Sequence, residues 1–184
     1  MRRALACCLS IGFLFWGACG TSLAQVPVKK SSARPGSGLS TLPVVEKVGL
    51  ATLKRILAAD SGNVVLLNAW ASWCKPCAEE MPGLLKIHRS ARGKPLRLIL
   101  LSTDDSDDLE TKVRPALKKF GVDFTTYIMS DSSEDAFISG LSDEWSGALP
   151  ATFFYDRQGN LAEMKVGERT YSQFKEAVDR LLGR

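Results

Sequence analysis

Two cysteines separated by two residues, Cys74 and Cys77, are the part of this 184-residue chain whose spacing points most directly to chemistry. They follow an apolar run, 64–70, and precede a helix-compatible stretch from Ala78 onward. Such a pair at a strand-to-helix junction can cycle between dithiol and disulfide. A helix N-terminus favours negative charge, so it lowers the pKa of the first cysteine and favours the thiolate, which is the attacking species. The pattern indicates thiol–disulfide exchange.

Other uses of a cysteine pair are disfavoured by what surrounds it. A zinc site would need a second cysteine or histidine pair, and haem attachment needs a histidine where Ala78 stands. The acidic run 104–108 lacks the spaced ligands and closing glutamate of a calcium loop, and predicts a solvated loop with a helix N-cap at Asp107. His88, the single histidine, is expected on the outer, surface part of the redox helix. We expect no metal, and no cofactor beyond the redox-active disulfide itself.

The first 24 residues indicate export. Residues 1–3 give a basic start, residues 9–19 are largely apolar, and small residues at 22–24 suit a signal peptidase. We predict a signal peptide over 1–24, with an uncleaved membrane anchor as the alternative, because the apolar stretch is short for a membrane span.

A second processing site lies at Cys19. Gly17-Ala18-Cys19 resembles the end of a lipoprotein signal, but Trp16 stands where that pattern has an aliphatic residue, so we favour cleavage after Ala24 over lipidation. Removing the signal removes two arginines and no acid, which takes the formal charge from +4 to +2. A nearly neutral chain gives no argument for binding nucleic acid. The mature chain keeps two of the five cysteines, both in the redox pair.

The remaining sequence divides into a linker and one domain. Residues 25–41 are rich in serine, glycine and proline and read as a flexible linker, and the domain is expected over 42–184. Hydrophobic periodicity predicts alternating strands and helices, with a hairpin turn at 157–160. The expected strands are 43–48, 63–70, 96–102, 124–129, 151–156 and 161–166, and the expected helices are 50–59, 75–92, 107–120, 133–141 and 171–182. This order predicts an α/β fold with a mixed sheet covered on both faces.

The motif, the order of elements and the closing hairpin and helix together resemble the thioredoxin superfamily over residues 42–184. Four features carry the resemblance: Trp73-Cys74-Lys75-Pro76-Cys77, a helix proline at Pro82, Leu149-Pro150 before a strand, and Lys165-Val166-Gly167 before the last helix. The chain is most similar to the extracytoplasmic TlpA/ResA-like thiol–disulfide oxidoreductases. The resemblance implies a thioredoxin-like three-layer α/β/α sandwich with a mixed central sheet and one inserted strand–helix unit.

In the site that this resemblance implies, Cys74 is the exposed nucleophile and Cys77 is the shielded cysteine that resolves the mixed disulfide. The plainer alternative is a static disulfide. Lys75 is expected to favour the thiolate, or else to be a solvated surface lysine, and Pro76 suits the first helical turn and stiffens it. Trp73 is expected to cover the exposed sulfur.

Glu80 lies three residues after Cys77, on the same helical face. It would take the proton of Cys77 if burial raised its pKa toward neutrality; the alternative is an acid that only favours the helix dipole. Asn68 stands where thioredoxins carry a buried aspartate and is expected to hydrogen-bond within the sheet or toward the site. The resemblance implies that Leu149 and Pro150 contact an extended substrate, with Pro150 in the cis form.

We therefore predict a periplasmic or cell-envelope reductase of protein disulfides, with cytochrome c maturation as one fitting role. An oxidising compartment offers no glutathione system, so re-reduction is expected to need a membrane-embedded thiol donor. The alternatives are a disulfide oxidase or isomerase of the same fold and a copper-binding chaperone, for which His88 is poorly placed. We expect a monomer.

Overall fold

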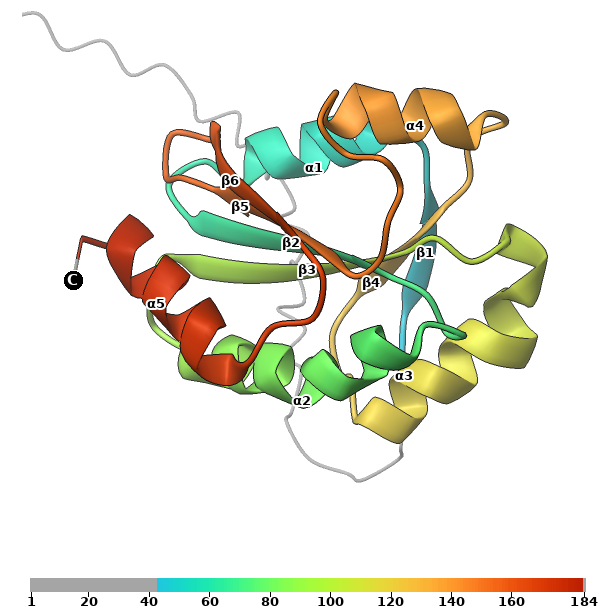
Figure 1. Cartoon of the computed structure of the whole chain (residues 1–184), viewed down its shortest axis with the longest axis horizontal. Helices are drawn as coiled ribbons and strands as arrows, with labels where there is room; N and C mark the ends of the chain where they lie inside the picture. Colours follow the sequence, from blue (N-terminus) through green and yellow to red (C-terminus); the bar gives the residue numbers. More distant parts are fainter. Residues whose placement is uncertain (1–42, 184) are drawn as a thin grey trace, which may run out of the picture. The chain divides into compact units, whose positions relative to one another are not determined.

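The computed structural model describes residues 43–183, and all statements of structure below concern that part of the chain (Figure 1). The predicted signal peptide 1–24, the linker 25–41 and the alternative lipidation site Cys19 lie outside the described residues. Within residues 43–183, no helix combines the length and the apolar character that crossing a membrane requires.

The domain alternates strands and helices in the predicted order. Most bounds lie within two residues of those expected from the sequence. The strands are β1 (Val45–Val48), β2 (Val64–Trp70), β3 (Leu96–Ser102), β4 (Thr126–Met129), β5 (Ala151–Tyr155) and β6 (Leu161–Val166). The helices are α1 (Leu50–Ala59), α2 (Lys75–Ser90), α3 (Arg114–Phe120), α4 (Glu134–Leu141) and α5 (Tyr171–Leu181).

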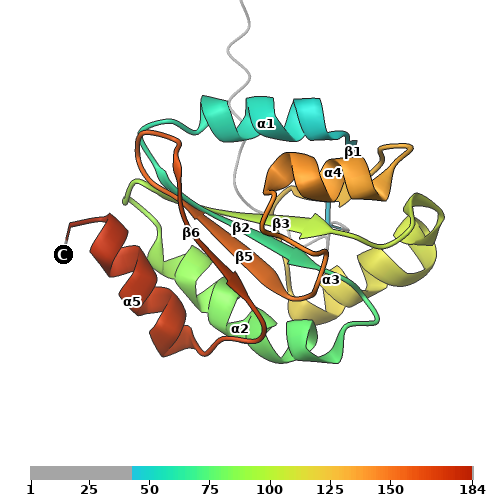
Figure 2. The same cartoon turned by 45° about the horizontal axis from the view of Figure 1, so that its top comes forward.

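The strands form one mixed sheet in the order β1-β4-β3-β2-β5-β6. The first four in this order are parallel to one another, whereas β5 is antiparallel to both β2 and β6. Helices α2, α3 and α5 cover one face of the sheet and α1 and α4 cover the other (Figures 1 and 2). This is the predicted three-layer α/β/α sandwich, in which β4 lies between β1 and β3.

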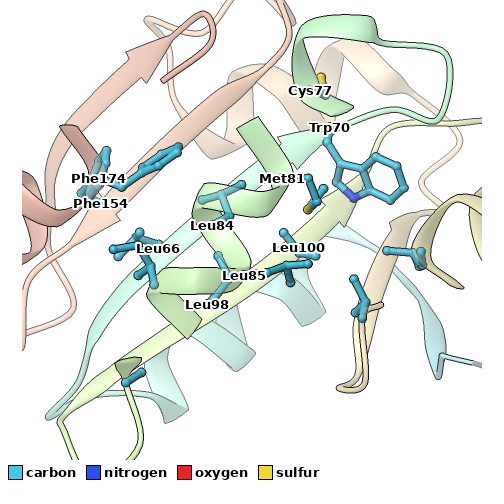
Figure 3. Packing of buried hydrophobic residues seen from close by; sticks show 14 of the residues in the cluster. Leu66, Trp70, Cys77, Met81, Leu84, Leu85, Leu98, Leu100, Phe154 and Phe174 are labelled. Atoms are coloured by element: carbon cyan, nitrogen blue, oxygen red, sulfur yellow. The ribbon is translucent and has the colours of Figure 1, made fainter. Parts of the chain in front are cut away.

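The central strand β2 is buried along its whole length because helices cover both of its faces. Side chains alternate along a strand, so Leu66 and Trp70 join the core beneath α2, while Val65 and Leu67 join the core beneath α1 and α4. Figure 3 shows Leu66 and Trp70 with Met81 and other apolar side chains of α2. The same alternation directs Asn68 toward α2.

The predicted helix over 107–120 is wrong in its first half. The segment begins with a short 3₁₀ turn at Ser106–Asp108, continues through a wider π turn at Leu109–Val113, and becomes α-helical only at Arg114. Pro115, in the first turn of α3, has no N–H to donate to the preceding turn. The N-cap is Asp105, whose carboxylate accepts a hydrogen bond from the Asp107 N–H at 2.9 Å.

Candidate active site

The redox pair lies where β2 passes into α2. Cys74 is the N-cap of α2, and its Sγ accepts a hydrogen bond from the Cys77 N–H at 3.3 Å. The two cysteines form a disulfide bond. Cys74 retains 6% exposure and Cys77 retains none. Cys77 is therefore shielded, as the sequence predicted, but the prediction of an exposed Cys74 is wrong, because Cys74 is itself packed into the core above the start of α2.

The residues between and beside the cysteines form the solvent-facing rim of the pair. Trp73 is 70% exposed, so most of its indole ring faces solvent. Pro76 is exposed in the first turn of α2. The exposed Lys75 ammonium lies 3.7 Å from Glu79 Oε1, one turn along the helix. Glu79 thus offsets part of the positive charge that Lys75 brings to the sulfurs.

Glu80 is buried one turn after Cys77, with 2% exposure. Its Oε1 accepts a hydrogen bond from Asn68 Nδ2 at 2.8 Å, and its Oε2 accepts one from the Arg169 N–H at 3.0 Å. Burial raises the pKa of Glu80 to about 7, because desolvation of the carboxylate outweighs the two hydrogen bonds that stabilise it. The negative charge of Glu168 raises the same pKa further. A carboxyl group that titrates near neutrality can both accept and release a proton under physiological conditions.

Asn68 connects Glu80 to the neighbouring strand. Its Nδ2 also donates to Thr152 Oγ1 at 3.0 Å, and Thr152 lies opposite Asn68 in the antiparallel pair of β2 and β5. Both side chains are buried. Asn68 Oδ1 is a buried atom for which residues 43–183 supply no hydrogen-bond partner. Thr152 and Arg169 were not among the residues that the sequence singled out.

Pro150 lies at the sheet edge where β2 ends. The register pairs Ala69 with Ala151, which brings the start of β5 beside the end of the strand that leads to the redox pair. The Leu149–Pro150 peptide bond is cis, as the resemblance implied. The Pro150 carbonyl accepts a hydrogen bond from the Gly167 N–H at 2.8 Å, and the partly buried Leu149 packs against both cores.

Asp104 was predicted to be part of a solvated loop, and this is wrong. Its buried carboxylate accepts hydrogen bonds from the Ser72 N–H at 2.9 Å, the Ser72 hydroxyl at 2.5 Å and the Ser102 hydroxyl at 2.6 Å. Asp104 lies two residues after the end of β3, and β3 runs parallel to β2, so the carboxyl ends of both strands meet at one edge of the sheet. The position of Asp104 just after a predicted strand next to β2 was the sequence signal that could have placed it near the redox pair. No cluster suited to a metal ion occurs in the described part of the chain.

His88 is half-buried rather than on the surface. Its ring stacks on Phe124, with ring centroids 4.1 Å apart, and burial lowers its pKa. It lines a cavity with Arg92, Leu98 and other residues near the far end of α2. Eleven residues of helix separate it from Cys77, which corresponds to about 16 Å along the axis, so it is not part of the redox site.

Comparison with known proteins agrees with this geometry. The Redoxin family matches residues 50–181. The thiol-disulfide oxidoreductase ResA of Bacillus cereus is 31% identical over 114 residues, which cover 62% of this chain and 61% of that protein. The thioredoxin-like protein YneN of Bacillus subtilis is 28% identical over 171 residues, which cover 92% of this chain and 91% of that protein. The chain thus spans about three fifths of the ResA relative's length and nearly all of YneN.

Solved structures confirm the fold. A thiol:disulfide interchange protein of the thioredoxin family from Chlorobium tepidum has a TM-score of 0.58 at 21% identity, covering 68% of this chain and 84% of that one. A secreted thiol-disulfide isomerase from Corynebacterium glutamicum has a TM-score of 0.57 at 23% identity, and the match covers 70% of this chain and 75% of that one. The chain belongs to the Redoxin family, has a thioredoxin-like fold and is similar to the thiol-disulfide oxidoreductase ResA and to YneN.

Proposed function

We propose that this protein is an extracytoplasmic thiol–disulfide oxidoreductase that reduces disulfides in protein substrates. The observation that carries the proposal is the placement of Glu80. A buried carboxyl group with a pKa of about 7 lies one helical turn from Cys77, in a helix that begins at a Cys74–Cys77 disulfide. A purely structural disulfide has no use for such a proton acceptor.

The reaction begins with the reduced pair. The Cys74 thiolate attacks one sulfur of the substrate disulfide, forms a mixed disulfide and releases the first substrate sulfur, which takes a proton from water. Cys77 then gives its thiol proton to the Glu80 carboxylate, and its sulfur attacks Cys74 Sγ. The second substrate sulfur leaves as a thiolate and takes a proton from water, the Cys74–Cys77 disulfide forms, and Glu80 returns its proton to water. The substrate has gained two electrons from the cysteine pair and two protons by way of water.

The substrate would bind across the exposed rim of the pair. Trp73 offers an apolar surface beside Cys74, and the start of β5 lies at the same edge of the sheet. The Pro150 carbonyl already accepts a hydrogen bond from the Gly167 N–H, so an extended substrate backbone would pair with the main-chain groups of Leu149 instead. This surface suits a protein or peptide and requires no bound cofactor.

Return to the dithiol form requires a reductant. We propose a membrane-embedded thiol donor, because an oxidising compartment supplies no glutathione system. Location outside the cytoplasm rests on the basic, apolar and small-residue pattern of residues 1–24. A role in cytochrome c maturation and a monomeric state belong to the same proposal.

The direction of the reaction depends on the reduction potential of the pair. A reductase requires a strongly negative potential, and an oxidase or isomerase requires a higher one. We expect equilibration with a series of glutathione or dithiothreitol buffers to give a potential below about −220 mV, more reducing than the potentials typical of oxidases and isomerases. The reduced protein should also reduce insulin disulfides, and Cys74→Ser should abolish this activity. A potential near about −120 mV, typical of a strong oxidant, would reverse the proposed direction.

A copper-binding chaperone has less support. His88 lies about 16 Å along α2 from Cys77 and stacks on Phe124, so it cannot complete a metal site with the pair.

A further inference from the structure

The Asn68 carboxamide lies between two buried partners that it contacts in the same way. Its Nδ2 group donates one hydrogen bond to Glu80 Oε1 at 2.8 Å and another to Thr152 Oγ1 at 3.0 Å. Its Oδ1 atom is buried, and no partner for it is found among residues 43–183. This orientation suits an ionised Glu80, because a carboxylate only accepts hydrogen bonds.

Protonation of Glu80 changes what its neighbours must supply. A carboxylic acid carries one O–H donor and needs an acceptor. Oε2 faces the Arg169 N–H, which is a donor. Oε1 faces Asn68 Nδ2, which is also a donor. An acceptor becomes available if the Asn68 amide turns by half a revolution and brings Oδ1 to face Oε1. The oxygen and nitrogen ends of an amide are close in size, so the turn requires no repacking.

We propose that Asn68 is a two-state positioning residue whose amide presents Nδ2 to the Glu80 carboxylate and Oδ1 to the protonated Glu80, and that it thereby transmits the protonation state of Glu80 to Thr152. In the first state the Thr152 hydroxyl accepts a hydrogen bond from Nδ2. In the second it donates one to Oδ1. A hydroxyl group can do both, so Thr152 remains paired in each state.

The two states are nearly balanced by the local hydrogen bonding. With Glu80 ionised, Asn68 Oδ1 lacks a partner; with Glu80 protonated, the Nδ2 hydrogens lack one. Each state therefore leaves one end of the same amide unpaired, at a similar desolvation cost. The charge on Glu80 then decides the orientation. Thr152 lies two residues after Pro150 on β5, so the change reaches the strand that begins at the proposed substrate-binding edge.

The groups that set the pH at which this switch occurs come from two elements. Glu168 and Arg169, in the loop after β6, place opposite charges near Glu80, and the Arg169 N–H holds Oε2. Cys77, on α2, is the proton donor in the reduced protein. In the oxidised protein the cysteines do not titrate, so Glu80 titrates without them. The importance of the switch for exchange rests on the proposed function, but the switch itself can be measured without any thiol chemistry.

The experiment is a pH titration of the oxidised, ¹³C- and ¹⁵N-labelled protein by NMR. We expect the Glu80 carboxyl carbon, the Asn68 side-chain amide and the Thr152 Cβ to change together, with one midpoint near pH 7. Thr126, a buried threonine on β4 that bonds to the Val44 carbonyl, is the control and should not change. In Glu80→Gln, which is neutral at every pH, the Asn68 and Thr152 signals should stay constant.

Asn68→Leu tests the transmission. Glu80 should still titrate, with its midpoint raised by about one pH unit. The substitution removes the hydrogen bond from Asn68 to Glu80 in both protonation states, and this bond stabilises the carboxylate more than the neutral acid. Thr152 should no longer respond. The proposal is overturned if the wild-type Asn68 and Thr152 signals stay flat through the Glu80 transition, or if Thr152 still titrates in Asn68→Leu. If Asn68→Leu does not fold, the comparison of the Asn68 and Thr152 titrations in wild type and in Glu80→Gln tests the proposal alone. A coupled titration in a protein that fails to reduce insulin would retain the switch and reject the proposed function.

Discussion

Ser72 and Asp104 are joined by two hydrogen bonds, one from the Ser72 N–H and one from its hydroxyl, both to the Asp104 carboxylate. Ser72 lies two residues before Cys74, whereas Asp104 follows β3. The Thr103 N–H also donates to the Trp70 carbonyl at 2.9 Å. The end of β3 therefore holds the main chain that leads into the redox pair.

Asp104→Ala should lower the free energy of unfolding by about 2–4 kcal/mol. The substitution removes three hydrogen bonds to a charged group and leaves the Ser72 N–H without its acceptor. Urea unfolding of the oxidised protein measures the change. Asp107→Ala removes an exposed carboxylate from the same acidic run and is the matched control, with an expected change of about 0.5 kcal/mol or less. Equal losses in the two variants would mean that Asp104 contributes only its charge.

The contrast between Asp104 and the cysteines shows what the sequence could and could not predict. Cys74, Cys77 and Glu80 follow one another at intervals of three residues, so helix geometry alone predicts that each lies one turn from the next. Asp104 reaches the site through strand pairing, and Thr152 does the same. Hydrophobic periodicity predicts that two strands exist but does not say which polar side chains meet across them.

The same distinction applies to the fold. The near-continuous apolar run of β3 and the helical spacing of apolar residues in α1 predicted both elements with their observed bounds. A strand buried on both faces is apolar along most of its length, and a helix buried on one face has apolar residues at helical spacing. The segment 107–120 carries a helical apolar stripe as well. Its first turns nevertheless widen into a π turn, which depends on local backbone hydrogen bonds that the stripe does not encode.

Cys77→Ser should trap the mixed disulfide with substrate. Cys77 is fully buried beside Cys74 and bonded to it, and residues 43–183 contain no third cysteine that could attack Cys74 Sγ in its place. Non-reducing gel electrophoresis after incubation with a disulfide-containing protein should show a covalent complex, and dithiothreitol should separate it into its two proteins by reducing the mixed disulfide. Cys74→Ser should give no complex. Normal turnover by Cys77→Ser with a dithiol donor would contradict the two-cysteine mechanism.

Glu80→Gln should slow release of the mixed disulfide by about 10²–10⁴-fold, the loss typical of a missing general base. Gln and Glu have nearly the same shape, so the disulfide and the fold should persist. Single-turnover kinetics with a fluorescent peptide disulfide measures the step. Glu79→Gln is the matched control, because Glu79 is exposed and pairs only with Lys75 in the described structure. Similar losses in both variants would assign the effect to helix-dipole charge, and no loss in Glu80→Gln would leave water as the proton acceptor.

Glu80 should also make the stability of the oxidised protein depend on pH in a defined window. Burial raises the pKa of this carboxyl from 4.5 to about 7, so between these values the folded protein binds more protons than the unfolded chain. Stability falls with rising pH wherever the folded state binds more protons. The contribution of Glu80 is therefore fully favourable below about pH 4.5, is lost as the pH rises to about 7, and stays constant above that. The free energy of unfolding of wild type minus that of Glu80→Gln, measured by urea at several pH values, should decrease across this window and then level off. A difference that does not vary with pH would show that the Glu80 pKa is the same in the folded and unfolded protein, and would remove the basis for its role as the proton acceptor of Cys77.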